Sequence, residues 1–134
     1  MAVTYTWRGG VTSTELNVLH AEAFDTGVYS DAEWDWVAQL EGHSLGWVVA
    51  REGDALVGFV NVVWDGLVHA WIQDTMVTSA ARHRGIATEL VALAVDRSRA
   101  AGCEWLHVDF EDHLRPFYLQ ACGFEPTNGG LIRL

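Results

Sequence analysis

The segment MVTSAARHRGIATEL, residues 76–90, carries the residue types and spacing best suited to binding an anion. A strand is expected to end there, and after a short polar loop a helix opens around Gly85 and Ala87. These small residues let the backbone approach a ligand, and the free N–H groups of a helix start bind phosphate at the positive end of the helix dipole. Arg82 and Arg84 add guanidinium groups that hold phosphate oxygens well. Taken alone, the pattern is equally compatible with an ordinary helix start bearing exposed arginines.

The charge of this segment contrasts with that of the whole chain. The 134 residues include 8 basic and 18 acidic side chains, so the formal net charge is −10. Residues 79–99 hold four arginines against two acids, a local charge of +2, which leaves −12 for the rest. Such acidity argues against a nucleic-acid partner, which requires clustered basic residues. It suits cationic partners such as amines, although acidic excess also simply keeps proteins soluble.

Length and composition predict one globular domain over residues 1–134, since half of the residues are apolar and 19% are charged. No apolar run approaches the roughly 20 residues that span a bilayer. The first residues lack the pattern of a secretory signal, so we expect a cytoplasmic protein with no membrane partner. Cys103 and Cys122 match no paired metal or redox spacing, and we expect no metal. Three histidines also lack the spacing of metal ligands, and their side chains are expected to be hydrogen-bonded or exposed: His20, His43 and His69.

Strands and helices alternate along the chain and must position these residues. Strands are expected over residues 3–8, 45–51, 55–64, 67–77, 105–110 and 130–134, and helices over residues 12–24, 31–42, 85–100 and 114–122. The order βααβββαβαβ describes a mixed α/β domain. Its β–α–β unit over residues 67–110 requires a parallel strand pair with a right-handed crossover. Helices are therefore expected on both faces of one sheet.

Two linked motifs, Arg82-x-x-Gly85-x-Ala87 and the segment FYLQACGF at residues 117–124, together resemble the GNAT N-acetyltransferase superfamily. Arg82-x-x-Gly85-x-Ala87 matches the family signature Q/R-x-x-G-x-G/A, and Val77 sits where the family has its strand-end valine. The segment FYLQACGF, residues 117–124, is similar to the family's F-Y-x-x-x-G-F element. One helix and one strand separate the two motifs, which is typical of the family. The resemblance covers nearly the whole chain and implies a GNAT-like fold.

The resemblance implies acetyl-CoA as the acyl donor. The pantetheine arm would pair with main-chain groups at the end of the strand, at Met76, Val77 and Thr78. The pyrophosphate would be held by Arg82 and by the loop and helix start, formed by His83, Arg84, Gly85, Ile86, Ala87 and Thr88. Asp112 lies roughly where relatives often have an asparagine that contacts the cofactor. In the family, a splay between the strands that correspond to residues 67–77 and 105–110 admits the acetyl group and the amine.

By the same resemblance, Tyr118 would be the general acid and would also contact the cofactor. A phenol of pKa about 10 can hydrogen-bond or protonate a leaving thiolate whose parent thiol has a pKa of about 8.5. The alternative role for Tyr118 is packing of its helix against the sheet. The main-chain N–H of Val77 would polarise the thioester carbonyl.

The general base is left open. Many relatives carry a glutamate on the strand before the signature, and the matching position here is Gln73, followed by Asp74. Strand alternation puts these two side chains on opposite faces unless a bulge intervenes. Further candidates lie near the end of the next strand: His107, Asp109, Glu111 and His113. A water relay or a substrate amine of low pKa would remove the need for a base.

Acidic and aromatic residues indicate where an acceptor would bind. Helices one and two form the acceptor wall in the family, and residues 22–41 hold six acids and no basic residue. Trp34 lies among these acids, Trp64 and Trp71 lie on central strands, and Asp109 and Glu111 follow another strand. Acids and aromatic rings together attract a cation. Ordinary solvation of a helix face and core packing of tryptophan are the commoner roles of such residues.

The leading hypothesis is an acetyl-CoA-dependent N-acetyltransferase that transfers the acetyl group directly to a primary amine of a small molecule. Gln73 in place of a carboxylate keeps open a non-catalytic CoA-binding sensor or interaction module. A third hypothesis makes a protein N-terminus or a lysine the acceptor. Only EPTNGGLIRL follows the G-F element, which is shorter than the family's usual final hairpin, so a homodimer that completes the sheet edge is a further expectation.

Overall fold

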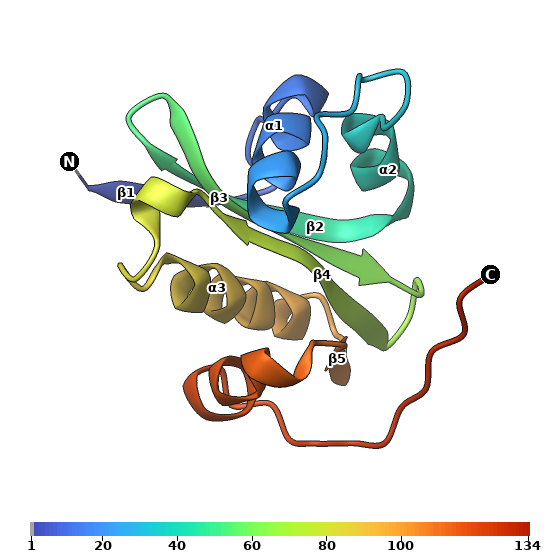
Figure 1. The fold of residues 1–134 in the computed structure, drawn as a ribbon. Helices are drawn as coiled ribbons and strands as arrows, with labels where there is room; N and C mark the ends of the chain where they lie inside the picture. The colour runs from blue at the N-terminus through green and yellow to red at the C-terminus, as the bar shows by residue number, and fades with distance from the viewer. Residues whose placement is uncertain (1) are drawn as a thin grey trace.

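The computed structural model describes residues 2–134 and has one mixed sheet flanked by helices on both faces (Figure 1). The five strands lie in the order β1-β2-β3-β4-β5. The strands are β1 (Val3–Trp7), β2 (Ser44–Glu52), β3 (Ala55–Trp64), β4 (His69–Val77) and β5 (Trp105–Val108). The helices are α1 (Ser13–Phe24), α2 (Trp36–His43) and α3 (Ile86–Ala100), with short helical turns η1 (Ser79–Ala81), η2 (Asp112–Leu114) and η3 (Pro116–Ala121). The predicted mixed α/β class is confirmed.

The pairing of β4 with β5 determines where the sheet opens. Strands β1 to β4 pair antiparallel, whereas β4 and β5 pair in parallel and are connected through α3. Their register runs from His69 opposite Trp105 to Ile72 opposite Val108 and stops there. Beyond Ile72, β4 continues to Val77 without β5 beside it. The two strands therefore separate at the end of β5, as a substrate site between them requires.

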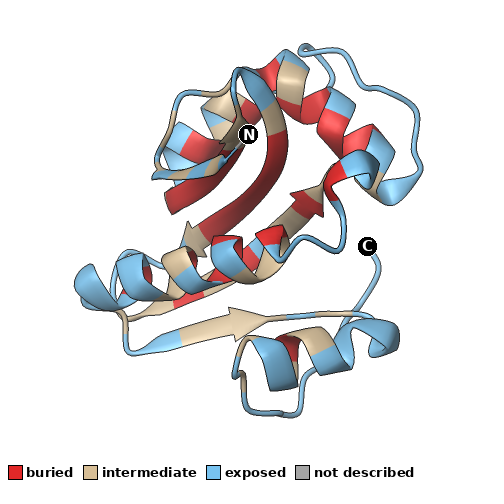
Figure 2. Cartoon of the chain, turned by 90° about the vertical axis from the view of Figure 1, so that its left-hand side faces the viewer, coloured by how far each residue is buried: buried red, intermediate tan, exposed pale blue. Residues whose placement is uncertain are grey.

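Two apolar clusters, one on each face of the sheet, hold the layers together. Figure 2 shows buried residues along the central strands and on the helices that cover them. On one face α1 and α2 bury side chains against β2, β3 and β4, among them Leu16, Trp36, Phe59 and Met76. On the other face α3 and η3 bury side chains against the sheet, among them Val60, Ile72, Leu90 and Tyr118. Burial of this apolar surface is the main stabilising contribution to the fold.

Local signals explain most helix boundaries. Thr12 caps α1 by accepting a hydrogen bond from Glu15 N, and the Glu15 side chain bonds back to Thr12 N. Asp35 caps α2 through Ala38 N, so this helix begins at Trp36 rather than at residue 31. Gly85, with φ of 77°, precedes α3 in a left-handed conformation that glycine adopts without strain.

One predicted element is not formed, the strand at residues 130–134. Residues 125–134 have no regular structure in the described chain, and Leu131 and Ile132 are 96% and 83% exposed. The edge strand β5 has only four residues, so pairing along it would form few hydrogen bonds for the backbone entropy lost in ordering the tail. The expected helix 114–122 is also modified into η2 and the π-helical η3, where Cys122 N donates to Phe117 O.

No helix within residues 2–134 has the length and apolar character needed to cross a bilayer.

Candidate active site

A cavity of about 1250 Å³ opens where β4 and β5 separate, and it is bounded by α1, α3, η3 and the C-terminal tail. One end of the cavity, the α3 end, is lined by Arg82, His83, Gly85, Ile86, Ala87 and Thr88. The other end, the acceptor half, is lined by Ala23, Phe24, Asp25, Trp71, Gln73, Asp74, Asp109, Glu111, His113 and Leu131. Tyr118 and Val77 also line the cavity. The structure thus brings together predicted residues from four separate elements.

A β-bulge in β4 puts both Gln73 and Asp74 in the cavity lining. Asn61 pairs with Gln73 and Phe59 pairs with Met76, so Asp74 and Thr75 share the single position opposite Val60. Asp74 has φ of 54°, a left-handed conformation that aspartate tolerates better than most residues. The sequence analysis expects Gln73 and Asp74 on opposite faces of the strand unless a bulge intervenes. This bulge is present, and both residues line the cavity.

The bulge also reverses which residues of β4 face each layer. Before it, Ala70 and Ile72 belong to the cluster beneath α3. After it, Met76 belongs to the cluster beneath α1 and α2, although alternation would have kept it with Ile72. Thr75 is thereby turned toward Tyr118.

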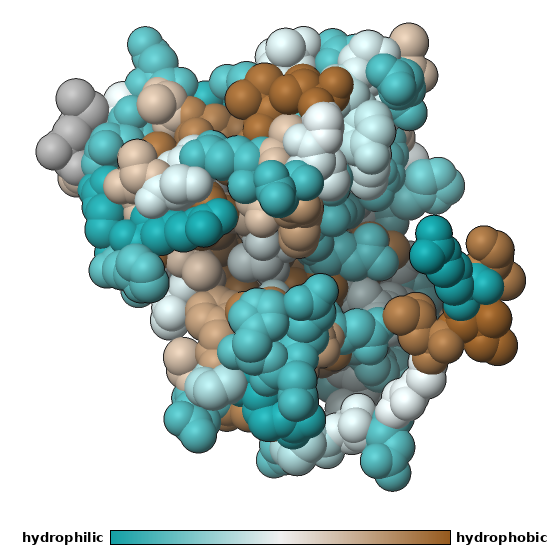
Figure 3. All heavy atoms as spheres, in the orientation of Figure 1, coloured by the Kyte–Doolittle hydropathy of each residue, from teal (hydrophilic) through white to brown (hydrophobic). Residues whose placement is uncertain are grey.

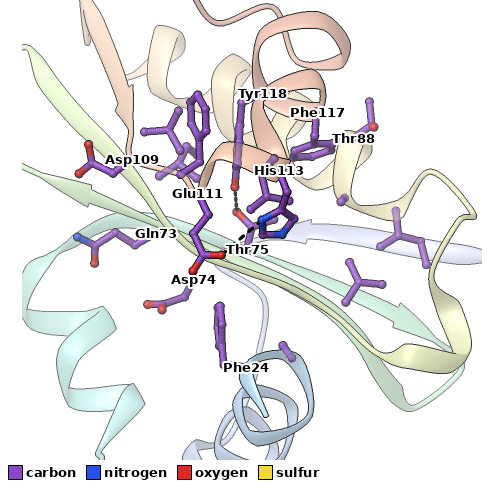
Figure 4. A pocket seen from close by; sticks show the side chains of 18 of the residues that line it. Phe24, Gln73, Asp74, Thr75, Thr88, Asp109, Glu111, His113, Phe117 and Tyr118 are labelled. Carbon is purple, nitrogen blue, oxygen red and sulfur yellow. Dashed lines mark hydrogen bonds and ion pairs between the residues drawn. The ribbon is translucent and has the colours of Figure 1, made fainter. Parts of the chain in front are cut away.

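Tyr118 Oη donates a hydrogen bond of 3.1 Å to Thr75 Oγ1 inside the cavity (Figure 4). Its ring stacks on Phe110, with 5.1 Å between centroids, and meets Phe117 edge-on at 4.8 Å. Burial raises the pKa of the Tyr118 phenol, and the bond to Thr75 partly offsets this effect. The phenol is therefore protonated at neutral pH and fixed in position by its neighbours.

Asp74 and Glu111 extend carboxyl groups into the same cavity (Figure 4). Burial raises the pKa of Asp74 above its ordinary value, and the charge of His20 lowers it in part. Glu111 lies 3.4 Å from His113 Nδ1, at an exposed position. Asp74 is thus the carboxylate whose environment has moved its pKa toward the range useful to a general base.

The α3 end offers main-chain donors. No side chain caps the start of α3, and Gly85 presents no Cβ between the backbone and the cavity. Arg82 lines this end, whereas Arg84 forms an ion pair with Glu52 of β2. From α1, Glu22 Oε1 accepts a 2.9 Å hydrogen bond from Ser79 N in the turn that precedes α3.

Some residues expected near the cofactor lie outside the cavity lining. The side chain of Met76 is buried in the core, and Thr78 N donates to Val57 O of β3. Asp112 faces Arg115 at 3.5 Å.

Two of the three tryptophans expected at the acceptor also lie outside the cavity lining. Trp34 stacks on Trp36, with 4.8 Å between the rings, and Trp64 donates its indole N–H to Leu67 O. Only Trp71 reaches the cavity.

The lining residues without a sequence signal of their own include Phe24, Thr75 and Leu131. Phe24 ends a helix and Leu131 lies in the tail, so only the tertiary structure brings them to β4. Thr75 could be found only by locating the bulge. Within residues 2–134, no three His, Cys, Asp or Glu side chains gather as a metal site.

Comparison with known proteins agrees with this geometry. A model of the acetyltransferase (GNAT) family matches residues 13–124, and the chain belongs to that family. A GNAT-family acetyltransferase from Streptococcus pneumoniae superposes with a TM-score of 0.78 at 21% identity, covering 99% of this chain and 98% of that one. No curated protein sequence matches the chain.

Two further structures show the same fold at 18% identity. Glucosamine-6-phosphate N-acetyltransferase from Arabidopsis thaliana has a TM-score of 0.75, with 98% of each chain covered. An aminoglycoside N-acetyltransferase in complex with CoA has a TM-score of 0.76, with 99% of this chain and 94% of that chain covered. The fold, the family and the matched range support an acyltransferase.

Proposed function

We propose that the protein is an acetyl-CoA-dependent N-acetyltransferase that moves the acetyl group directly to a primary amine of a small molecule. The observation that carries this proposal is the continuity of one cavity from the start of α3, past Tyr118 and Asp74, to the wall formed by α1. A nucleotide-bearing donor and an amine can meet at the opening between β4 and β5. The CoA in the aminoglycoside acetyltransferase complex supports the choice of donor.

The residues at the α3 end suit the pyrophosphate of CoA. The uncapped amides of α3 and the guanidinium of Arg82 are donors for phosphate oxygens, and Gly85 leaves the backbone accessible. Main-chain groups of Met76, Val77 and Thr78 are proposed to follow the pantetheine arm. Acetyl-CoA supplies a thioester activated for attack by an amine.

Asp74 is proposed to take a proton from the substrate ammonium, directly or through water, so that the free amine can attack. The amine nitrogen attacks the thioester carbon to form an oxyanion, whose collapse then breaks the C–S bond. Tyr118 donates its proton to the departing sulfur, and the nitrogen loses its second proton through water to the Tyr118 phenolate. The N–H of Val77 is proposed to stabilise the oxyanion formed between these events. Gln73 and Asp109 line the amine side of the same cavity and are proposed to orient the acceptor.

Calorimetric titration with acetyl-CoA tests the cofactor site. We expect one-site binding that weakens about 10-fold or more in Arg82→Ala, the size of a charge-assisted hydrogen bond. Arg84→Ala should weaken binding less, because Arg84 is engaged by Glu52. Absence of binding at millimolar acetyl-CoA would contradict the proposal.

Thiol release with a panel of amines and lysine peptides then tests the reaction. Release that depends on a small amine supports the proposed activity. Binding of acetyl-CoA without amine-dependent release would instead identify a non-catalytic CoA-binding module, and selective release with peptides would identify a protein acetyltransferase.

We also propose that the protein is cytoplasmic and forms a homodimer. Two free cysteines support a reducing compartment. The apolar tail residues Leu131, Ile132 and Leu134 are exposed beside the body of the molecule (Figure 3), and β5 has an unpaired edge, which together offer a surface for a second copy. Light scattering should give twice the monomer mass for the native protein. The Ile132→Glu variant should have the mass of a monomer.

A further inference from the structure

A row of three aromatic side chains leads outward from the acceptor half of the cavity. Trp71 lines the cavity, and its ring stacks on His107 with 4.9 Å between centroids and 18° between planes. His69 continues the row, 5.1 Å from His107 and 6.0 Å from Trp71. His69 Nδ1 and His107 Nε2 lie 2.8 Å apart, which is hydrogen-bond distance. The two histidines thus support one side of the Trp71 ring.

The register of β4 and β5 explains this row. Trp71 lies opposite His107 in the parallel pair, and His69 is two residues before Trp71 on the same face. These half-buried side chains lie on the face where the α1 and α2 helices pack, but neither the row nor Trp71 belongs to the apolar cluster beneath those helices. The row is therefore not explained by core packing.

Two exposed apolar side chains line the same cavity as Trp71. Phe24, at the end of α1, is 48% exposed and lines the same cavity. Leu131, in the C-terminal tail, is 96% exposed and also lines it. Large apolar side chains exposed around a cavity indicate a bound apolar group.

The carboxyl groups of the acceptor half line the same cavity as this apolar region. Four carboxyl groups lie in the acceptor half, from Asp25, Asp74, Asp109 and Glu111, and its one basic side chain, His113, faces Glu111. Asp74 and Trp71 are three residues apart, a distance of at most about 10 Å along a strand. No carboxylate belongs to the row of His69, Trp71 and His107.

We propose that the acceptor is an arylalkylamine cation, whose aromatic ring lies against Trp71 while a short linker carries its amine to Asp74, with Phe24 and Leu131 as further apolar walls of the same cavity. This inference rests on the proposed function and specifies its substrate class. A second ammonium group beyond the ring would lie along the row, where the Asp65 carboxylate is already engaged by the main-chain N–H groups of Leu67 and His69. A phosphorylated amine would meet the carboxylates of the acceptor half as like charges.

A matched set of amines tests the proposal by acetyl-CoA-dependent thiol release. Phenethylamine carries an aromatic ring, and cyclohexylethylamine carries a saturated ring of the same carbon number. We expect kcat/KM for phenethylamine to exceed that for cyclohexylethylamine by about 3- to 10-fold, the size of one aromatic contact, with spermidine and glucosamine-6-phosphate below both. A preference for spermidine or glucosamine-6-phosphate would overturn the proposal and leave the proposed function intact.

Variants of Trp71 assign the preference to this residue. Trp71→Leu should remove the preference for phenethylamine, and Trp71→Phe should retain part of it. Trp105→Leu, a matched change at a 61% exposed tryptophan on the adjacent strand, should leave the preference unchanged. His107→Ala should raise the KM for phenethylamine more than the KM for cyclohexylethylamine, because it releases the Trp71 ring. An equal loss with both amines in Trp71→Leu would overturn the proposal.

Acetyl-CoA titration and circular dichroism verify that each variant is folded, and Trp71→Phe replaces Trp71→Leu if the latter does not fold. If acetyl-CoA binds but no amine releases thiol, the proposed transfer fails. Titration of the acetyl-CoA-loaded protein with phenethylamine then tests the ring site at Trp71 separately. Binding of phenethylamine that is weaker in Trp71→Phe supports this site, and absence of binding overturns it.

Discussion

At the scale of single residues, Asp74 combines a left-handed backbone with a buried carboxyl group. The backbone conformation, with φ of 54°, creates the bulge, and burial raises the pKa of the side chain. Asparagine tolerates the same left-handed conformation, so Asp74→Asn removes the proposed proton acceptor without adding backbone strain. We expect kcat/KM to fall about 100-fold or more, measured by thiol release with a saturating donor.

The pH dependence of kcat/KM in the native protein also tests the proposed role of Asp74 as a base. The base must be ionised, so kcat/KM should rise with pH through the raised pKa of Asp74, at higher pH than for an exposed aspartate.

The contribution of Asp74 to stability should change with pH in the opposite direction. A carboxyl group whose pKa is raised by folding binds its proton more tightly in the folded state, so its contribution to stability is present at low pH and lost as pH rises through the folded pKa. Asp74→Asn should therefore raise Tm at neutral pH, and a lower Tm would argue against burial of the charge.

Tyr118 and Thr75 allow the acid to be tested with a graded pair of variants. Tyr118→Phe removes the hydroxyl but keeps the ring contacts with Phe110 and Phe117, so we expect kcat to fall about 100-fold with little change in acetyl-CoA affinity. Thr75→Val removes the hydrogen-bond acceptor of the phenol and should give a smaller loss, which Thr75→Ser restores. An unchanged kcat in Tyr118→Phe under single-turnover conditions would exclude the acid role.

At the scale of secondary-structure elements, one hydrogen bond connects the helix that walls the acceptor half to the turn that precedes α3. Glu22 of α1 accepts from Ser79 N, within reach of solvent. Loss of this acceptor in Glu22→Ala should weaken acetyl-CoA binding about 3-fold, since one exposed hydrogen bond contributes about 0.5–1 kcal/mol. Glu22→Gln retains a carbonyl oxygen and should bind acetyl-CoA like the native protein. Equal weakening in both variants would show that charge, rather than the hydrogen bond, is what matters.

At the scale of the whole molecule, the net charge of −10 should attract a cationic acceptor toward the acidic end of the cavity. Raising the ionic strength from about 20 mM to about 500 mM shortens the Debye length severalfold. We therefore expect kcat/KM for a cationic amine to fall several-fold through an increased KM, while kcat at saturation stays constant. A neutral inert polymer of equal osmotic strength serves as the control, and salt-independent KM values would argue against electrostatic attraction.

The sequence alone determined the class of fold, because its information is local. Strand alternation, helix caps such as Thr12 and Asp35, and the glycine before α3 act within a few residues. The motif around Arg82 and Gly85 predicts an anion site, and both residues line the α3 end of the cavity. The same local signals predicted a strand at residues 130–134 that is not formed, because an apolar run forms a strand only where a partner strand is available.

The tertiary structure decided how the chemistry is assembled. Alternation could not predict that a left-handed Asp74 would reverse the facing of β4, bringing Asp74 into the cavity and Thr75 to Tyr118. It also could not predict that Arg84 would pair with Glu52, or that Trp34 would stack on Trp36 away from the cavity. These outcomes depend on contacts between residues far apart in the chain, whose energies are settled only when the sheet and its two helical layers pack together.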